Sequence, residues 1–425
     1  MTSSARAFLR VAAFLLAFAG RAEDWPQWRG PLRDGAWHED VRLGSSAPAN
    51  LKIAWRARVG PGWSSPVVAK GYVYVTDVEI ARHKAKERVL CFKADNGKLR
   101  WRHEYAVRYP NWAFDPAVGG PRATPIVHGG RLYTLGCLGD LFCLDAVTGR
   151  VLWKKGLAAE YGVKDFSGIT ASPLIENDLL ILFICGQPEA CVIALDRNSG
   201  KEAWKALDDS FTYSSPLVIN ESGQRQLIIW TQEAVTSLNP ATGQTWWRQV
   251  VPTPGDQAVS TPVFANHRLL VGGLMLQLDT NKPAASVLWP QEPAASKRVL
   301  SNTSTALLQD DCVFSGRTSG EFVCLEAVTG RELWRTNSVT GLGNGSSIHL
   351  TPCGNTVFLF TDEGNLIRAE LTAAGYRELG RAQLLEPTSP FGGKKRSWTP
   401  PAYANGRVFA RNDKELVCAS LIAKP

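Results

Sequence analysis

The chain repeats one pattern of apolar and polar positions along most of its length. Each copy opens with a small residue and a proline, as in WSSPVV (63–68), and continues with alternating apolar residues, as in VVAKGYVYVTD (67–77). Residues two apart on a strand share one face of a sheet, so the alternation predicts short, half-buried strands. Further openings stand at 122–127, 170–175, 213–218 and 259–264, with degenerate copies at 303–308, 346–351 and 398–403. The pattern therefore predicts eight units.

A second motif, a glycine turn followed by a strand that ends in tryptophan, has the same period. LDAVTGRVLW (144–153) and LEAVTGRELW (325–334) are identical at eight of ten positions, whereas LDTNKPAASVLW (278–289) has lost the turn glycine. Gly149 and Gly330 stand where a tight turn needs a positive φ, which glycine adopts without strain. The tryptophans that end the copies are Trp101, Trp153, Trp204, Trp247, Trp289 and Trp334.

Units of about 45 residues, each with four short antiparallel strands, predict an all-β fold, an eight-bladed β-propeller. A two-sheet sandwich needs no strict period, and a parallel β-helix needs a much shorter one. The last unit stops at ELVCASL (415–421), before any tryptophan strand, while LKIAWRARV (51–59) resembles the missing strand. Because an open propeller would expose sheet edges, we expect the N-terminal strand to pair into the last blade. We expect the repeated tryptophans to fill the gaps between adjacent blades.

The N-terminus has the composition of an export signal. Two arginines precede the short apolar run VAAFLLAFAG (11–20), and small residues predict cleavage after Ala19 or Ala22. The run is too short to span a bilayer, and no cysteine near the cleavage point offers a lipid anchor. An uncleaved anchor is the alternative. We expect a periplasmic or secreted protein with a signal peptide (1–22), an N-terminal extension (23–50) and a single propeller (51–425).

Charge and cysteine content exclude some functions. The net charge is +8, but the longest basic run, in GGKKRSW (392–398), holds three adjacent cations, which favours a solvated loop over a nucleic-acid surface. No HExxH, CxxC, P-loop or GxSxG motif occurs, so we predict no metal site and no catalytic residues.

Cys185 and Cys191 flank GQPEA in a predicted hairpin, and they either form a disulfide or stay reduced. Four cysteines at equivalent blade positions are expected to be buried: Cys91, Cys143, Cys324 and Cys418.

Aligning the eight openings places one residue of each blade in a ring at the mouth of the central channel. These residues are Trp63, Arg122, Thr170, Tyr213, Val259, Thr303, Ser346 and Trp398. Aromatic rings and a guanidinium hold planar or anionic ligands, which makes candidates of Trp63, Arg122, Tyr213 and Trp398. A ring of mixed side chains that simply seals the channel is the alternative.

The repeats resemble those of the pyrroloquinoline quinone (PQQ) propeller superfamily. An A-x-T-G-x-x-x-W-like signature is matched at Ala146–Trp153 and Ala327–Trp334, and in shortened form at Ala241–Trp247. DWPQWRGP (24–31) and LKIAW (51–55) also look like the N-terminal pattern of that family. The resemblance covers residues 24–421 and implies the eight-bladed fold.

Two functions are implied by this resemblance. Quinoprotein dehydrogenases bind PQQ and calcium at the channel mouth beside a Cys-Cys pair, and they carry an acidic base and large insertions. This short chain has no Cys-Cys pair. BamB-like members are non-catalytic scaffolds with a lipid-anchored cysteine, which is also absent here. The leading expectation is an exported, monomeric, non-catalytic scaffold for protein or peptide partners in the cell envelope, without cofactor. The alternative is a quinoprotein-type oxidoreductase dependent on PQQ and calcium.

Overall fold

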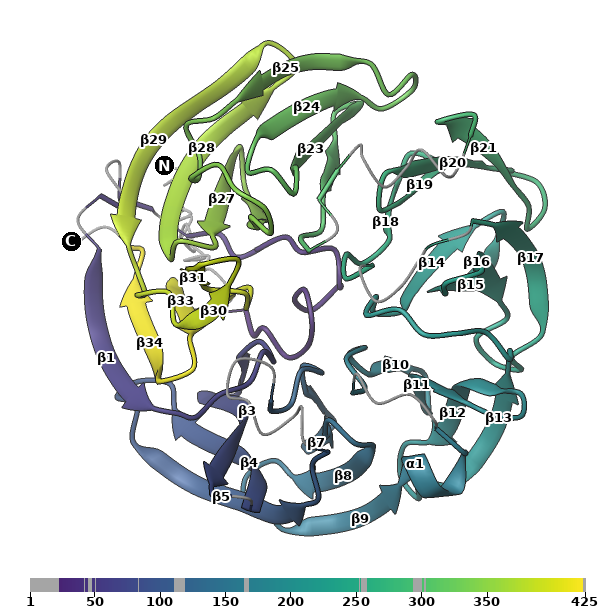
Figure 1. Ribbon diagram of the computed structural model, residues 1–425, viewed down its shortest axis with the longest axis vertical. Coiled ribbons are helices and arrows are strands. Elements are labelled where there is room, and N and C mark those ends of the chain that lie inside the picture. Colours follow the sequence, from purple (N-terminus) through teal and green to yellow (C-terminus); the bar gives the residue numbers. More distant parts are fainter. Residues whose placement is uncertain are drawn as a thin grey trace, which may run out of the picture.

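Eight four-stranded antiparallel sheets surround a central axis as the blades of a propeller (Figure 1). The structure is a computed structural model. It describes residues 23–41, 43–44, 48–49, 51–82, 84–110, 119–163, 168–251, 253, 258–292, 300–301 and 303–422. The predicted fold is confirmed. The predicted signal peptide lies outside the described residues.

Within each blade the strands follow one another from the axis outward. Blades 1 and 2 comprise β2 (Val67–Ala69), β3 (Tyr72–Ala81), β4 (Lys84–Lys93) and β5 (Leu99–Val107), then β6 (Ile126–His128), β7 (Arg131–Leu135), β8 (Asp140–Asp145) and β9 (Val151–Gly156). Blades 3 and 4 comprise β10 (Leu174–Glu176), β11 (Leu179–Gly186), β12 (Ala190–Asp196) and β13 (Glu202–Ala206), then β14 (Leu217–Glu221), β15 (Gln224–Trp230), β16 (Ala234–Leu238) and β17 (Thr245–Val250). The one described α-helix, α1 (Leu157–Glu160), is a single turn after β9.

The second half of the chain continues in the same way. Blades 5 and 6 comprise β18 (Val263–Ala265), β19 (Arg268–Val271), β20 (Leu274–Leu278) and β21 (Ala285–Trp289), then β22 (Leu307–Gln309), β23 (Cys312–Gly316), β24 (Phe322–Glu326) and β25 (Glu332–Thr336). Blade 7 comprises β26 (Ile348–Cys353), β27 (Thr356–Thr361), β28 (Asn365–Thr372) and β29 (Gly375–Gln383). A separate hairpin follows, formed by β30 (Ser389–Phe391) and β31 (Lys394–Arg396).

The last blade joins the two ends of the propeller. It comprises β32 (Ala402–Ala404), β33 (Arg407–Arg411), β34 (Glu415–Ser420) and, on its outer edge, β1 (Lys52–Arg58). The antiparallel register runs from Lys52 opposite Ser420 to Arg58 opposite Glu415. The predicted closure by the N-terminal strand is therefore confirmed, and it gives the last blade the same four strands as the other seven.

The tryptophan repeat joins neighbouring blades, as predicted. The indole nitrogen of Trp101 donates to the Ala146 carbonyl oxygen of the next blade at 3.2 Å. The same indole covers Gly149, where a Cβ atom would lie only 2.6 Å from the ring. Gly149 also has a φ of +74°. The turn glycine is thus required for its backbone conformation and because it leaves room for an indole. The same pairing joins Trp55 to Gly97, Trp153 to Gly200, Trp204 to Gly243 and Trp289 to Gly330.

Two tryptophans lack this contact with a glycine. Trp334 of blade 6 donates to the Thr372 carbonyl oxygen of blade 7 at 2.9 Å, and the nearby Gly375 has no atom within 4 Å of an added Cβ. Trp247 of blade 4 donates instead to Gln226 of its own blade, at 2.8 Å. The next blade is the one whose turn has lost its glycine, in LDTNKPAASVLW (278–289), so the two changes occur at the same interface.

Cysteine positions follow the strand pattern. Cys91, Cys143, Cys324 and Cys418 lie on the third strands of their blades and are buried, as expected. Cys185 and Cys191 lie opposite each other between β11 and β12, with their Sγ atoms 3.5 Å apart. In the part of the chain that the structure describes, no helix is long and apolar enough to cross a membrane.

Candidate functional site: the central channel

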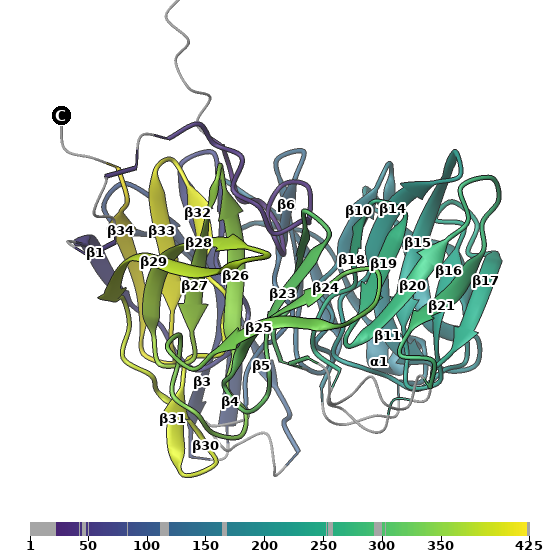
Figure 2. The ribbon, with the colours of Figure 1, turned by 90° about the horizontal axis from the view of Figure 1, so that it is seen from above.

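The N-terminal segment, residues 24–37, crosses one end of the central channel (Figure 1). We call this end the upper face and the opposite end, which carries the β30–β31 hairpin, the lower face (Figure 2). Trp25 exchanges two backbone hydrogen bonds of 2.8 Å with Val68 of blade 1. The carbonyl oxygen of Pro26 accepts a bond of 2.8 Å from the Val127 amide of blade 2. The segment therefore binds the propeller partly as an added strand.

Side chains of the N-terminal segment reach the remaining sides of the channel. Trp28 donates from its indole nitrogen to the Thr261 hydroxyl of blade 5 at 2.8 Å. The Trp37 amide donates to the Pro352 carbonyl of blade 7 at 2.8 Å. The Arg33 guanidinium, in a side chain only 6% exposed, donates to carbonyl oxygens of blades 3 and 4. One short segment thus makes hydrogen bonds to six blades, packs Trp25 and Trp37 against Tyr403 of the last blade, and covers the upper mouth.

The predicted ring lies at the lower mouth, where the innermost strands begin. Seven of its eight residues precede their strand by four positions, which confirms the alignment of the openings. The guanidinium carbon of Arg122 lies 4.7 Å from the centre of the Trp63 ring and 5.8 Å from that of Tyr213. Three of the four candidates are therefore brought together, with a cation between two aromatic faces.

The fourth candidate, Trp398, has different neighbours. Its ring packs edge-on against Phe391 of the β30–β31 hairpin, at 5.2 Å between ring centres. Its carbonyl oxygen accepts a hydrogen bond of 2.9 Å from His349 Nε2. The hairpin that positions Phe391 is anchored by an ion pair between Arg396 and Asp362, both buried. Alignment of the openings predicted the position of Trp398 but not the hairpin that covers it.

A ring of hydroxyl groups just inside the lower mouth was not predicted. In four blades, the amide of the residue two positions after the ring residue donates to the equivalent hydroxyl of the next blade, at 2.9–3.0 Å: Ser65 to Thr124, Thr124 to Ser172, Ser172 to Ser215, and Thr261 to Thr305. The sequence carries a sign of this ring in the serine or threonine that precedes the proline of the openings S-S-P, A-T-P, A-S-P and S-T-P. The pattern alone identifies this position as a small residue before the strand, whereas the structure shows that its hydroxyl joins adjacent blades.

Burial inside the channel shifts the pKa values of three basic side chains. Desolvation lowers the pKa of Arg29 to about 10 and that of Arg33 to about 9. Desolvation also lowers the pKa of His349 to about 4, and the nearby Arg29 charge acts in the same direction. His349 is therefore neutral at pH 7, and its Nε2 carries the proton donated to the Trp398 carbonyl.

A buried carboxyl group lies between blades 1 and 2. Glu87 accepts hydrogen bonds from the hydroxyls of Tyr105 at 2.5 Å and Tyr109 at 2.6 Å, and from the Cys137 amide at 3.1 Å. Burial raises the pKa of Glu87, while the three donors act against that shift. Because these donors satisfy the carboxyl group, the cluster stabilises the interface between the two blades.

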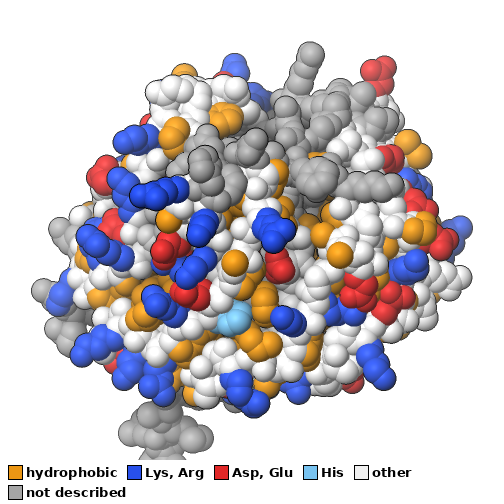
Figure 3. All heavy atoms as spheres, turned by 60° about the horizontal axis from the view of Figure 1, so that its bottom comes forward, with side chains coloured by type: hydrophobic (Ala, Val, Ile, Leu, Met, Phe, Trp, Pro, Cys, Tyr) orange, Lys and Arg blue, Asp and Glu red, His pale blue; other side chains and the backbone are white. Residues whose placement is uncertain are grey.

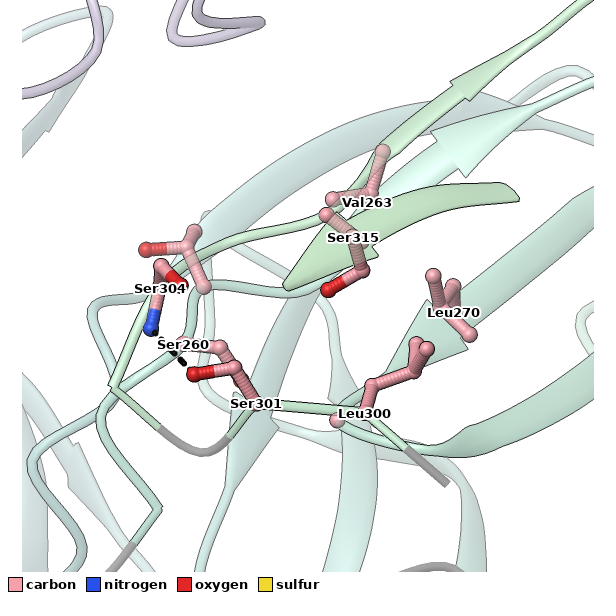
Figure 4. A pocket seen from close by; sticks show the side chains of 10 residues that line it. Ser260, Val263, Leu270, Leu300, Ser301, Ser304 and Ser315 are labelled. Atoms are coloured by element: carbon pink, nitrogen blue, oxygen red, sulfur yellow. Dashed lines mark hydrogen bonds between the residues drawn. The ribbon is translucent and has the colours of Figure 1, made fainter. Parts of the chain in front are cut away.

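Serines also line the gap between blades 5 and 6. Ser260, Ser301, Ser304 and Ser315 face this gap together with Leu270 and Leu300 (Figure 4). The Ser304 amide donates to the Ser301 hydroxyl at 3.3 Å. The gap has no room for a water molecule, so it is a packing interface and not a ligand site.

The outer surface shown in Figure 3 carries many Lys and Arg side chains, with Asp and Glu side chains interspersed among them. Ion pairs join exposed charges of the described residues, as in the contacts of Lys86 with Glu104 and of Arg377 with Glu370. Mixed, paired charges are typical of a solvated surface.

The lower mouth can offer a ligand the aromatic rings of Trp63 and Tyr213 and the positive charge of Arg122. Calcium takes six to eight oxygen ligands, usually including several carboxylates. Among the described residues, no three His, Cys, Asp or Glu side chains are placed to hold a metal ion. The described residues of the lower mouth therefore supply no cluster of carboxylates for calcium.

The fold and the channel together define the class. The protein is an eight-bladed propeller closed by its own N-terminal strand, with one channel mouth covered by the N-terminal segment. Two overlapping matches to the family described as outer membrane protein assembly factor BamB cover residues 85–299 and 278–377. They include more than half of the chain, which belongs to this family of PQQ-like repeat proteins.

Individual relatives include an outer membrane protein assembly factor and a dehydrogenase. BamB of Burkholderia pseudomallei (strain K96243) is 25% identical over 237 residues, which are 52% of this chain and 58% of that protein. Polyvinylalcohol dehydrogenase of Sphingopyxis sp. (strain 113P3) is 27% identical over 223 residues, which are 48% of this chain and 30% of that protein. The matched segments thus span less than two thirds of the length of either relative.

Solved structures show the same fold at low sequence identity. BamB from Moraxella catarrhalis superposes with a TM-score of 0.59 and 18% identity, covering 87% of this chain and 99% of that chain. Quinohemoprotein alcohol dehydrogenase from Comamonas testosteroni superposes with a TM-score of 0.63 and 15% identity, covering 95% and 81%. BamB and an alcohol dehydrogenase share this fold, so function must be argued from the site.

Proposed function

We propose that the protein is a non-catalytic scaffold of the cell envelope that binds extended polypeptide segments. The observation that supports this proposal most directly is the N-terminal segment itself. Residues 24–37 are bound by backbone pairing with blade 1 and by side-chain anchors such as the half-buried Trp28 and the buried Arg33. Strand addition and buried aromatic or arginine anchors are general modes of peptide recognition. With the upper mouth covered, the partner surface is the lower face.

Export to the periplasm or beyond belongs to the same proposal. It rests on the signal-like residues 1–22 and on the name of the family, which refers to assembly of the outer membrane. The partners we propose are envelope proteins or peptides, bound by a monomer.

A quinoprotein-type oxidoreductase remains the second candidate. The specific observation in its favour is the Arg122 guanidinium between the rings of Trp63 and Tyr213. That arrangement suits a planar, anionic cofactor such as PQQ.

The scaffold proposal is tested by crosslinking from defined positions. A photoreactive amino acid replaces Tyr213 at the lower mouth and, as the matched control, the exposed Leu32 at the upper face. Crosslinking in intact cells should join polypeptides to the protein from position 213 and not from position 32. Adding Arg122→Ala to the position-213 variant should weaken those crosslinks. Equal crosslinking from the two positions would refute a lower-face partner site.

A further inference from the structure

A small cavity lies inside the channel, against the N-terminal segment. It measures about 40 Å³ and is lined on one side by Trp28, Arg29 and Gly35. Ser65, Thr303 and His349 of three blades contribute to its other sides. Space for one water molecule or a similarly small ion begins at about 10–15 Å³, so the cavity holds a small group.

Two positive charges enter the channel here without acidic partners. Arg29 donates to the carbonyl oxygens of Arg33 at 3.3 Å and Asp34 at 2.6 Å. Arg33 donates to the Pro173 and Pro216 carbonyls, and its buried Nε has no partner among the described residues. The Asp34 carboxylate points to the surface, where it contacts His38 at 2.7 Å. Both guanidinium groups thus donate to neutral oxygens and form no ion pair among the described residues, although the Asp34 charge favours the cationic form of Arg29.

A buried charge without a counter-charge is costly. The lowered pKa values of Arg29 and Arg33 reflect this cost, but both values stay well above 7. The two groups are thus cations at neutral pH. An anion in the cavity would offset the cost of burying Arg29, which lines it.

One hydroxyl group in the same cavity also lacks a partner. In the hydroxyl ring, four acceptors receive the amide hydrogen of the preceding blade: Thr124, Ser172, Ser215 and Thr305. The position that should donate to Ser65 is occupied by Pro400, which has no amide hydrogen. The Ser65 hydroxyl is consequently buried without a hydrogen-bond partner among the described residues. Both Ser65 and Pro400 line the cavity.

We propose that this cavity binds a small monovalent anion, of the size of chloride or formate, between the Arg29 guanidinium and the Ser65 hydroxyl. Arg29 supplies the positive charge, and Ser65 donates the hydrogen bond that the propeller leaves unused. Because Arg29 belongs to the N-terminal segment and Ser65 to blade 1, the anion stabilises the closed upper mouth. This inference does not depend on the proposed function.

Thermal unfolding at constant ionic strength tests the anion site. Sodium gluconate, whose anion is too large for the cavity, is replaced stepwise by sodium chloride or sodium formate. The unfolding midpoint of the wild-type protein should rise by roughly 2 °C over 100 mM of the small anion, because ligand binding stabilises the folded state. Arg29→Gln and Ser65→Ala should reduce or abolish the rise. Arg225→Gln, which changes an arginine paired with Glu176 on the outer surface, should retain it.

A crystal of the wild-type protein grown in sodium bromide gives an independent result that does not depend on any variant folding. An anomalous peak between Arg29 and Ser65 supports the site. The proposal is overturned if the cavity contains only water and the midpoints in chloride, formate and gluconate are equal.

Discussion

Replacing Gly149 with alanine should destabilise the propeller by more than backbone strain alone. The residue has a φ of +74°, where an L-residue costs about 1–2 kcal/mol. A Cβ atom there would also lie 2.6 Å from Cε3 and 2.7 Å from Cδ2 of Trp101 on the neighbouring blade. Overpacking of this kind costs about 1–3 kcal/mol, so the total loss should be about 2–5 kcal/mol.

Gly223 offers a matched control for this substitution. Its φ is +68°, but a Cβ atom added there meets nothing within 4 Å. Gly223→Ala should therefore cost only the backbone strain, about 1–2 kcal/mol. Equilibrium unfolding in urea, followed by tryptophan fluorescence, compares the two variants. Equal losses would refute the claim that the turn glycine makes room for an indole.

A double-mutant cycle separates the packing contribution. In a Trp101→Ala background, Gly149→Ala should lose its extra cost and approach the Gly223→Ala value, because the clashing ring is gone. If the cost of Gly149→Ala is unchanged in that background, its origin lies within the turn itself.

Three further predictions concern single groups. Burial lowers the pKa of His349 from 6.5 to about 4, so as the pH falls the unfolded chain binds this proton before the folded protein does. The free energy of unfolding should therefore fall by roughly 3 kcal/mol between pH 6.5 and pH 4. His349→Gln should remove this part of the pH dependence of urea unfolding. Asp362→Asn leaves Arg396 buried without its carboxylate, which should lower the free energy of unfolding in urea by about 3–5 kcal/mol. The variant should also expose the β30–β31 hairpin to limited proteolysis. An unchanged free energy of unfolding would contradict an energetic role for this ion pair. Oxidised glutathione should join Cys185 and Cys191, whose Sγ atoms are 3.5 Å apart, in a disulfide; intact mass should fall by two hydrogen atoms, and Cys191→Ser should prevent this.

The repeat made most of the fold predictable from sequence. Strand alternation with a fixed period identifies eight units, and the unpaired tryptophan strand at residues 51–59 identifies the closure. Both features are local patterns that recur, so each copy supports the others. The position of the ring residues follows directly from that alignment.

Contacts made by non-repeated segments were not predictable in the same way. Residues 24–37 have no strand periodicity, so nothing in their sequence shows that Arg33 reaches the carbonyl oxygens of blades 3 and 4. The β30–β31 hairpin is likewise an insertion, and it determines the surroundings of Trp398. The partnerless Ser65 hydroxyl depends on Pro400 of another blade, and this link appears only when the ring is closed.

The measurement that tests the scaffold account most directly is a titration of the purified protein with PQQ in the presence of calcium, followed by a dye-linked alcohol oxidation assay. The account predicts no turnover with PQQ and calcium, because the described mouth offers no set of carboxylates for the metal. PQQ-dependent turnover that is lost in Arg122→Ala and retained in Arg225→Gln would contradict the scaffold account and establish an oxidoreductase.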